Sequence, residues 1–243
     1  MASFWMYTSA ELDFGWMREC EGFSQLRRTY LSERTAEVDM RDLLAAHPRR
    51  TLEPRRASLF FIPVWEVSSF YLGECNGTTH FQRMHRAASA LSASSHFTKR
   101  FPKGFDHFII TTGCIEANQR ARERLGPLGV LLRHAIVGRD RAYSSFYMSS
   151  AVGRCVIETP YVANRFLMSA HAPDSRQWLL SFHGSLDVCC EPGKSIRAVA
   201  RALVGLANDT VVVDVRQKEE WYRTQALTMQ NSKFCLVPAG DNE

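Results

Sequence analysis

Trp178-Leu179-Leu180-Ser181-Phe182 begins the region whose order of strands and helices is clearest in the sequence. This short apolar run is closed by Gly184 and predicts a buried strand. Residues 194–206 then repeat apolar side chains at helical spacing, which predicts a helix with one apolar face. The residues on that face are Ile196, Val199, Ala200, Leu203 and Leu206. Residues 210–215 are mostly β-branched and predict a second strand.

Two further elements complete this region: a helix over residues 219–230 and a strand over 234–237. Strand, helix, strand, helix and strand at this spacing predict a right-handed parallel β/α layer. Residues 169–175, which include Pro173, are the best candidate linker to the larger region before it. The sequence therefore predicts an α/β fold with two domains, over residues 1–170 and 171–243.

The preceding region also contains runs typical of strands. These runs are residues 57–65, with the strand ending at Pro63, 105–112, 135–137 and 155–157. Between them, residues 115–124 predict a polar helix that stops near Gly126-Pro127. The opening up to Arg49 has helical character but no clear pattern of elements.

Composition limits the classes of function. The chain has 243 residues, of which 45% are hydrophobic, so it can form a substantial buried core. Its 30 Lys and Arg against 25 Asp and Glu give a net charge of +5, spread along the chain. This mild excess suits a small anionic ligand and argues against dedicated nucleic-acid binding. The sequence contains neither a signal-peptide pattern nor a long apolar span, so we expect any membrane anchor to lie outside this chain.

The seven cysteines do not form a metal-binding pattern. There is no Cys-x-x-Cys pair and no Cys/His run at zinc spacing, so we expect no metal site and no cofactor. Cys155 and Cys235 lie in apolar runs, where a cysteine is usually a small buried side chain. His80 and His85 are five positions apart, off the helical spacing of paired metal ligands, and we expect both on the surface. These observations leave the redox compartment open.

Several common catalytic motifs are absent from the sequence. It has no Gly-x-Ser-x-Gly elbow, no Walker loop and no Gly-x-Gly-x-x-Gly, which weakens hydrolase, P-loop and dinucleotide-binding interpretations.

Three blocks, in order, carry a family resemblance. Residues 50–65 read Arg-Thr-Leu-Glu-Pro-Arg-Arg-Ala-Ser-Leu-Phe-Phe-Ile-Pro-Val-Trp, residues 104–108 read Gly-Phe-Asp-His-Phe, and residues 229–241 read Met-Gln-Asn-Ser-Lys-Phe-Cys-Leu-Val-Pro-Ala-Gly-Asp. Together they resemble the exostosin-like glycosyltransferases. The last block is the most specific, because it is similar to that family's Ser-Lys-Phe-Cys-Leu-x-Pro-x-Gly-Asp.

The resemblance implies a fold and a reaction. It implies two Rossmann-like domains of glycosyltransferase GT-B type, with the acceptor mostly on the first and the nucleotide sugar mostly on the second. The implied reaction transfers a sugar from a nucleotide sugar, with a UDP-sugar as the expected donor, to a glycan acceptor. The implied location is the Golgi membrane, on the lumenal side.

In that family the third block leads into a Ser-x-Arg helix and a Gly-Cys-x-Pro turn that would grip the donor. The present sequence ends at Glu243, before either segment. We therefore expect the second domain to be incomplete, as in a fragment, which leaves open whether this chain is an enzyme by itself. The alternative hypothesis is a non-catalytic, acceptor-binding module or an incomplete gene product.

Sugar transfer needs a base for the acceptor hydroxyl and a cationic cradle for the leaving diphosphate. Asp106 and His107, at the start of a predicted strand, are the candidate catalytic residues, as base or as orienting group. The alternative for His107 is a core histidine that satisfies a backbone carbonyl.

The candidate donor contacts lie in the second domain. Gly184 in the turn after the first strand, and Lys194 and Arg197 on the following helix, are predicted to bind the diphosphate. The alternative is that both cations are ordinary solvated side chains. Gly240 and Asp241 would supply a close backbone approach and a helix cap.

Three aromatic residues, Trp65, Tyr71 and Trp221, could stack on sugars. Burial in the core is the alternative for each, since large aromatic side chains are commonly buried.

Overall fold

The structure is a computed structural model, and it describes residues 2–27, 35–99, 104–111, 119–139, 155–159, 172–184, 186, 193–202, 208–214 and 219–236. Its contacts divide the chain into two compact units, with the main division between Val162 and Ala163. The predicted mixed α/β fold with parallel sheets is confirmed.

The first unit contains a five-stranded parallel sheet in chain order. Its strands are β1 (Phe4–Met6), β2 (Leu59–Phe61), β3 (His107–Thr111), β4 (Ile136–Arg139) and β5 (Cys155–Glu158). In the register Trp5 lies beside Phe60, and Phe60 beside His107, so three aromatic rings lie in one row across the sheet. Three of the four strand runs predicted here lie close to their predicted bounds, and β2 is shorter than its run.

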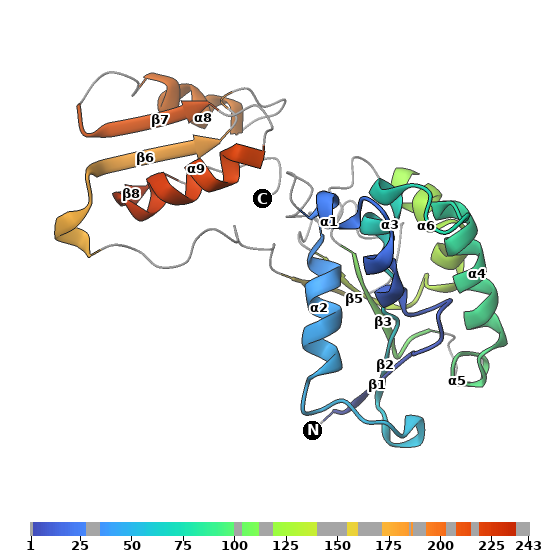
Figure 1. Cartoon of the computed structure of the whole chain (residues 1–243). Helices are drawn as coiled ribbons and strands as arrows, with labels where there is room; N and C mark the ends of the chain where they lie inside the picture. Colours follow the sequence, from blue (N-terminus) through green and yellow to red (C-terminus); the bar gives the residue numbers. More distant parts are fainter. Residues whose placement is uncertain are drawn as a thin grey trace. The chain divides into compact units, whose positions relative to one another are not determined.

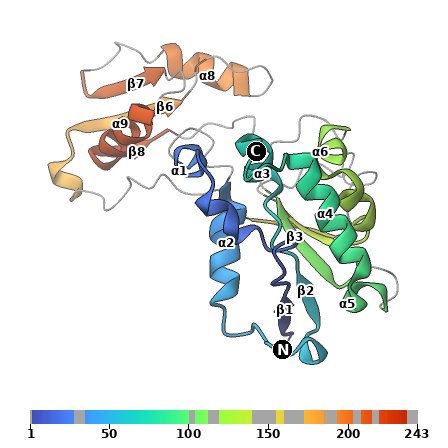
Figure 2. The ribbon, with the colours of Figure 1, turned by 45° about the vertical axis from the view of Figure 1, so that its right-hand side comes forward.

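Helices pack on both faces of this sheet (Figures 1 and 2). The helical elements described in this unit are η1 (Phe14–Glu19), α1 (Phe23–Leu26), α2 (Ala36–Ala45), η3 (Pro54–Arg56), α3 (Glu66–Leu72), α4 (His80–Ala93), α5 (Ser95–Thr98) and α6 (Gln119–Leu131). One face packs on α2, where Phe4, Met6 and Ile110 contact Met40 and Leu44.

The other face carries the larger core, beneath α4 and α6. It contains Phe60 and Ile109 from the strands, with Met84, Leu91 and Leu128 from the helices. Helix α4 begins with a capping box, in which the Thr79 side chain accepts from the backbone N–H of Gln82 and the Gln82 side chain accepts from that of Thr79. Such a cap satisfies two otherwise unpaired donors and so fixes where the helix begins.

The prediction that a helix stops near Gly126-Pro127 is confirmed. Within α6 the backbone of Gly126 is non-helical, and a second helical segment continues to Leu131 beyond this kink. Gly126 has φ 51°, a region that favours glycine, and this residue breaks the helical path. Pro127 then begins the next turn, where its missing N–H is not needed, so the second part of the helix forms directly after it.

The second unit contains a three-stranded parallel sheet in the order β7-β6-β8. Its elements are η4 (Pro173–Ser175), β6 (Trp178–Gly184), α8 (Gly193–Ala202), β7 (Thr210–Asp214), α9 (Glu219–Gln230) and β8 (Ser232–Cys235) (Figure 1). The alternation of strands and helices predicted for this region is confirmed. None of the helices described in either unit is both long and apolar enough to span a bilayer.

Candidate functional site

The carboxyl end of β6 is the candidate donor site. β7 lies on one side of β6 and β8 on the other, so the strand order reverses at β6. In open α/β sheets, ligands bind outside the carboxyl ends of strands where the order reverses. His183 and Gly184 are the last two residues of β6 and therefore lie at that position.

Two of the predicted donor residues lie together at this strand end. A Cβ on Gly184 would lie 2.9 Å from the ring of Phe182 and 3.6 Å from Nη1 of Arg197. Arg197 reaches this point from α8, the helix that follows β6, and its side chain is half-buried. The absent side chain of Gly184 thus leaves room for the Phe182 ring, and the Arg197 guanidinium lies within contact distance of the same strand end.

His183 is a polar group at this strand end that the sequence analysis did not select. Neither of its ring nitrogens has a hydrogen-bond partner among the described residues, although both atoms are buried. Burial lowers the pKa of His183, so the ring is neutral near pH 7 and retains one N–H donor. A buried donor without a partner costs free energy, which a bound anion could recover.

The other predicted donor residues lie partly or wholly outside the described residues. Lys194 belongs to the first turn of α8, but its side chain is outside the described part of the chain. Gly240 and Asp241 also lie outside it.

Asp106 and His107 are in contact, at the amino end of β3. Nδ1 of His107 lies 2.9 Å from a carboxylate oxygen of Asp106, and Nε2 lies 2.9 Å from the hydroxyl of Tyr7. His107 is fully buried, with its ring stacked on Phe60. Both ring nitrogens are thus engaged within the first unit. This environment matches a histidine satisfied in the core, through a tyrosine hydroxyl and a carboxylate rather than a backbone carbonyl.

The burial of His107 gives a prediction. Replacing His107 by glutamine is expected to lower the free energy of unfolding by about 1–3 kcal/mol, because the Tyr7 hydroxyl loses a buried partner. Urea denaturation followed by circular dichroism measures this change. His85→Gln, on the exposed side of α4, is the control and should have little effect. Unchanged stability combined with lost sugar transfer would instead support the predicted catalytic role.

A network of buried polar and charged groups connects α2, α3, β3 and α6. The Glu37 carboxyl group accepts from the backbone N–H of Val67 and of Ser68, at 3.3 and 2.6 Å. Glu66 accepts from the Thr111 hydroxyl at 2.6 Å and forms an ion pair with Arg124, with Nε and Oε1 2.7 Å apart. Burial, followed by the negative charge of Glu66, raises the pKa of Glu37 to about 8.

The prediction that His80 lies on the surface is wrong. His80 is buried, with Nδ1 2.9 Å from the Ser69 hydroxyl and Nε2 2.8 Å from the carbonyl oxygen of Arg124. Burial lowers its pKa to about 4, so the ring is neutral near pH 7. The spacing of the two histidines argues against a pair of metal ligands, but it does not predict burial. His80 is buried because it begins α4 on the side that faces the core. His85 is exposed, as predicted.

The cysteine side chains that the structure describes have two different environments. Cys20 and Cys75 form a disulfide across 55 positions of sequence, which no local spacing had indicated. Cys235 is a free, exposed thiol, so the expectation that it is buried is wrong. It belongs to β8, a strand that is exposed from Lys233 to Cys235. No group of three potential metal ligands occurs in the described part of the chain.

Two of the three candidate sugar-stacking residues can be assessed. Trp65 is fully buried, with its ring stacked on Phe23, as the core alternative expected. Tyr71 is partly exposed at the end of α3. The side chain of Trp221 lies outside the described residues.

Comparison with known proteins supports the family resemblance that the three sequence blocks carry. The Exostosin GT47 domain matches residues 16–242. Probable beta-1,4-xylosyltransferase IRX10L of Arabidopsis thaliana is 25% identical over 214 residues, covering 84% of this chain and 50% of that protein. The chain thus spans about half the length of this curated relative. Because the domain match covers nearly all of the sequence, the chain belongs to the exostosin GT47 family of glycosyltransferases.

Proposed function

We propose that this chain belongs to a glycosyltransferase that moves a sugar from a UDP-sugar to a glycan acceptor, with the diphosphate bound at the carboxyl end of β6. The observation that carries this proposal is the position of Arg197 beside Gly184 at the reversal of strand order. Negative charge develops on the diphosphate as it leaves, and a guanidinium stabilises it.

The residues at this strand end have different roles in binding the diphosphate. Arg197 neutralises the diphosphate, the N–H groups at the start of α8 face the same anion, and His183 donates one hydrogen bond. Lys194, in the first turn of α8, adds a second cation. Asp106 and His107 remain the candidate base and orienting group from the sequence, with the core environment of His107 as the competing role.

Two Rossmann-like domains of GT-B type are the fold that we propose for the whole enzyme. Two compact units, each with its own parallel sheet, support it. We further propose the Golgi lumen as the location, because the Cys20–Cys75 disulfide suits an oxidising compartment. The name of the Arabidopsis relative makes a xylose donor the first to test, within a panel of UDP-sugars.

The donor proposal is tested by a substitution on α8. Arg197→Ala is expected to weaken UDP binding about 10- to 100-fold, as for loss of a charged hydrogen bond. Isothermal titration calorimetry with UDP measures it. Arg201→Ala removes an exposed charge from the same helix and serves as the matched control. Equal UDP affinity in the wild type and both variants would remove Arg197 from the site.

The pocket described below favours the non-catalytic, acceptor-binding module as a second candidate. Saccharide binding by the first unit, combined with no measurable binding of any UDP-sugar, would support that module over the transferase.

A further inference from the structure

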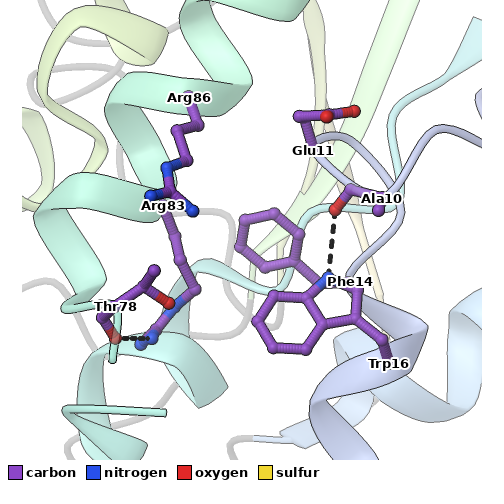
Figure 3. Close-up of a pocket in the computed structure, with 7 residues that line it drawn as sticks. All are labelled: Ala10, Glu11, Phe14, Trp16, Thr78, Arg83 and Arg86. Atoms are coloured by element: carbon purple, nitrogen blue, oxygen red, sulfur yellow. Dashed lines mark hydrogen bonds between the residues drawn. The ribbon is translucent and has the colours of Figure 1, made fainter. Parts of the chain in front are cut away.

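A cavity of about 140 Å³ lies in the first unit, between the loop after β1 and the first two turns of α4 (Figure 3). It is lined by Ala10, Glu11, Phe14, Trp16, Thr78, Arg83 and Arg86, which we call the Trp16–Arg86 pocket. The backbone N–H of Phe14 donates to the carbonyl oxygen of Pro63, two residues after β2. The pocket therefore lies beyond the carboxyl ends of β1 and β2, where α/β sheets bind ligands.

One wall of this pocket carries a buried positive charge. Arg83 is 3% exposed, and its guanidinium donates to Oγ and O of Ser69, to O of Gly73 and to O of Thr78. All four acceptors are uncharged oxygens. No carboxylate in the described part of the chain forms an ion pair with Arg83, and burial lowers its pKa. The hydrogen bonds of Arg83 are satisfied, but its charge is not compensated.

A second arginine adds to this charge. Arg86 follows Arg83 by three positions on α4, so both side chains extend from the same face of the helix. Arg86 is exposed and has no hydrogen bond or ion pair within the described ranges. Two like charges at this spacing repel each other, and an anion between them and solvent would relieve that repulsion.

The opposite wall is aromatic (Figure 3). The indole N–H of Trp16 donates to the carbonyl oxygen of Ala10 at 3.0 Å, which holds the ring in place. Phe14 lies beside it. Glu11 stands across the pocket from Arg86, and the two do not form an ion pair. Each is thus available to a ligand placed between them.

These walls define the ligand. A sugar ring has a face of C–H groups for an aromatic wall and hydroxyls for a carboxylate such as Glu11. The volume is close to that of a cavity of about 150 Å³ known to hold benzene, so the pocket is of a size to hold a single ring. The uncompensated positive charge of Arg83 further indicates that the ligand carries an anionic group.

We propose that the Trp16–Arg86 pocket binds one acidic sugar residue, with its ring on Trp16 and Phe14 and its anionic group at Arg86. The anionic group is a carboxylate or a phosphate ester. That this residue belongs to the glycan acceptor rests on the proposed transferase function; the binding itself does not.

The test is direct binding of three sugars, glucuronate, glucose 6-phosphate and glucose, measured by ligand-observed NMR. At least one acidic sugar should bind about tenfold or more tightly than glucose, and Arg86→Ala should abolish that preference. Arg55→Ala, an exposed arginine at the other end of the unit, is the control and should leave it unchanged. Thermal melting of each variant checks folding.

Comparing glucuronate with glucose 6-phosphate shows whether the pocket prefers a carboxylate or a phosphate ester. Similar binding of all three sugars, no binding, or equal effects of Arg86→Ala and Arg55→Ala would overturn the proposal. So would a loss of UDP binding in Arg86→Ala, since that would assign the nucleotide to this pocket. Failure of the donor proposal is recognised separately, because it depends on Arg197 and UDP alone.

Discussion

Replacing both Cys20 and Cys75 by alanine is expected to lower the free energy of unfolding of the first unit by about 4 kcal/mol. The disulfide closes a loop across 55 positions, and without it the unfolded chain recovers the entropy of that loop. The bond also joins Cys20, directly after η1, to Cys75, in the segment between α3 and α4. Urea denaturation followed by circular dichroism measures the loss.

The matched control is Cys235→Ala, which removes an exposed free thiol. This variant should unfold at the urea concentration of the wild type. Reduction of the wild type should reproduce the effect of the double substitution. If oxidised and reduced wild type unfold alike, the disulfide does not contribute the stability assigned to it.

Glu37→Gln is expected to remove a loss of stability that the wild type shows above pH 6.5. The folded state holds a proton on Glu37 up to a pH of about 8, whereas the ordinary pKa of a glutamate carboxyl is 4.5. The folded state therefore binds more protons over that interval, and stability falls as the pH rises. Between pH 6.5 and 8 the loss is about 2 kcal/mol in the wild type. Glutamine does not titrate, so the variant should lose none.

His80 acts in the opposite direction at lower pH. Its pKa is about 4 when folded and 6.5 ordinarily, so the unfolded state binds more protons between these values and stability rises with pH. In the wild type this gain offsets the Glu37 loss between about pH 4.5 and 6.5. In Glu37→Gln the His80 gain should appear without that offset, so stability should rise more steeply with pH than in the wild type over this interval. A wild-type profile that is flat up to pH 8 would contradict the raised pKa of Glu37.

The sequence predicted best where local pattern and tertiary packing agree. The β-branched run at Thr210–Asp214 forms β7, and the helical pattern over Gly193–Ala202 forms α8. Both elements could be predicted because their signals come from neighbouring residues alone. β1 was missed because Phe4–Met6 is a strand of three residues, too short for a periodic signal. Its identity depends on pairing with Leu59–Phe61, which only the fold provides.

The sites divide in the same manner. The proximity of Gly184 and Arg197 could be predicted from the sequence, because the two residues occupy one strand–helix step. The Trp16–Arg86 pocket was not, since its two walls are ordinary segments far apart in the sequence that meet only when α4 packs on the sheet. His80 was misplaced for a related reason: its burial comes from contact with the carbonyl oxygen of Arg124, 44 positions away.

The parallel pairing of the first sheet has a consequence during synthesis. Phe4 pairs with Leu59, so β1 is made before β2 and has no neighbouring strand until 55 more residues have been added. At ribosomal rates of about 5–20 residues per second, that wait is about 3–11 s. Throughout it, Phe-Trp-Met is an apolar segment of the nascent chain whose neighbouring strand has not been made. This segment therefore stays open to chaperone binding until β2 has been synthesised.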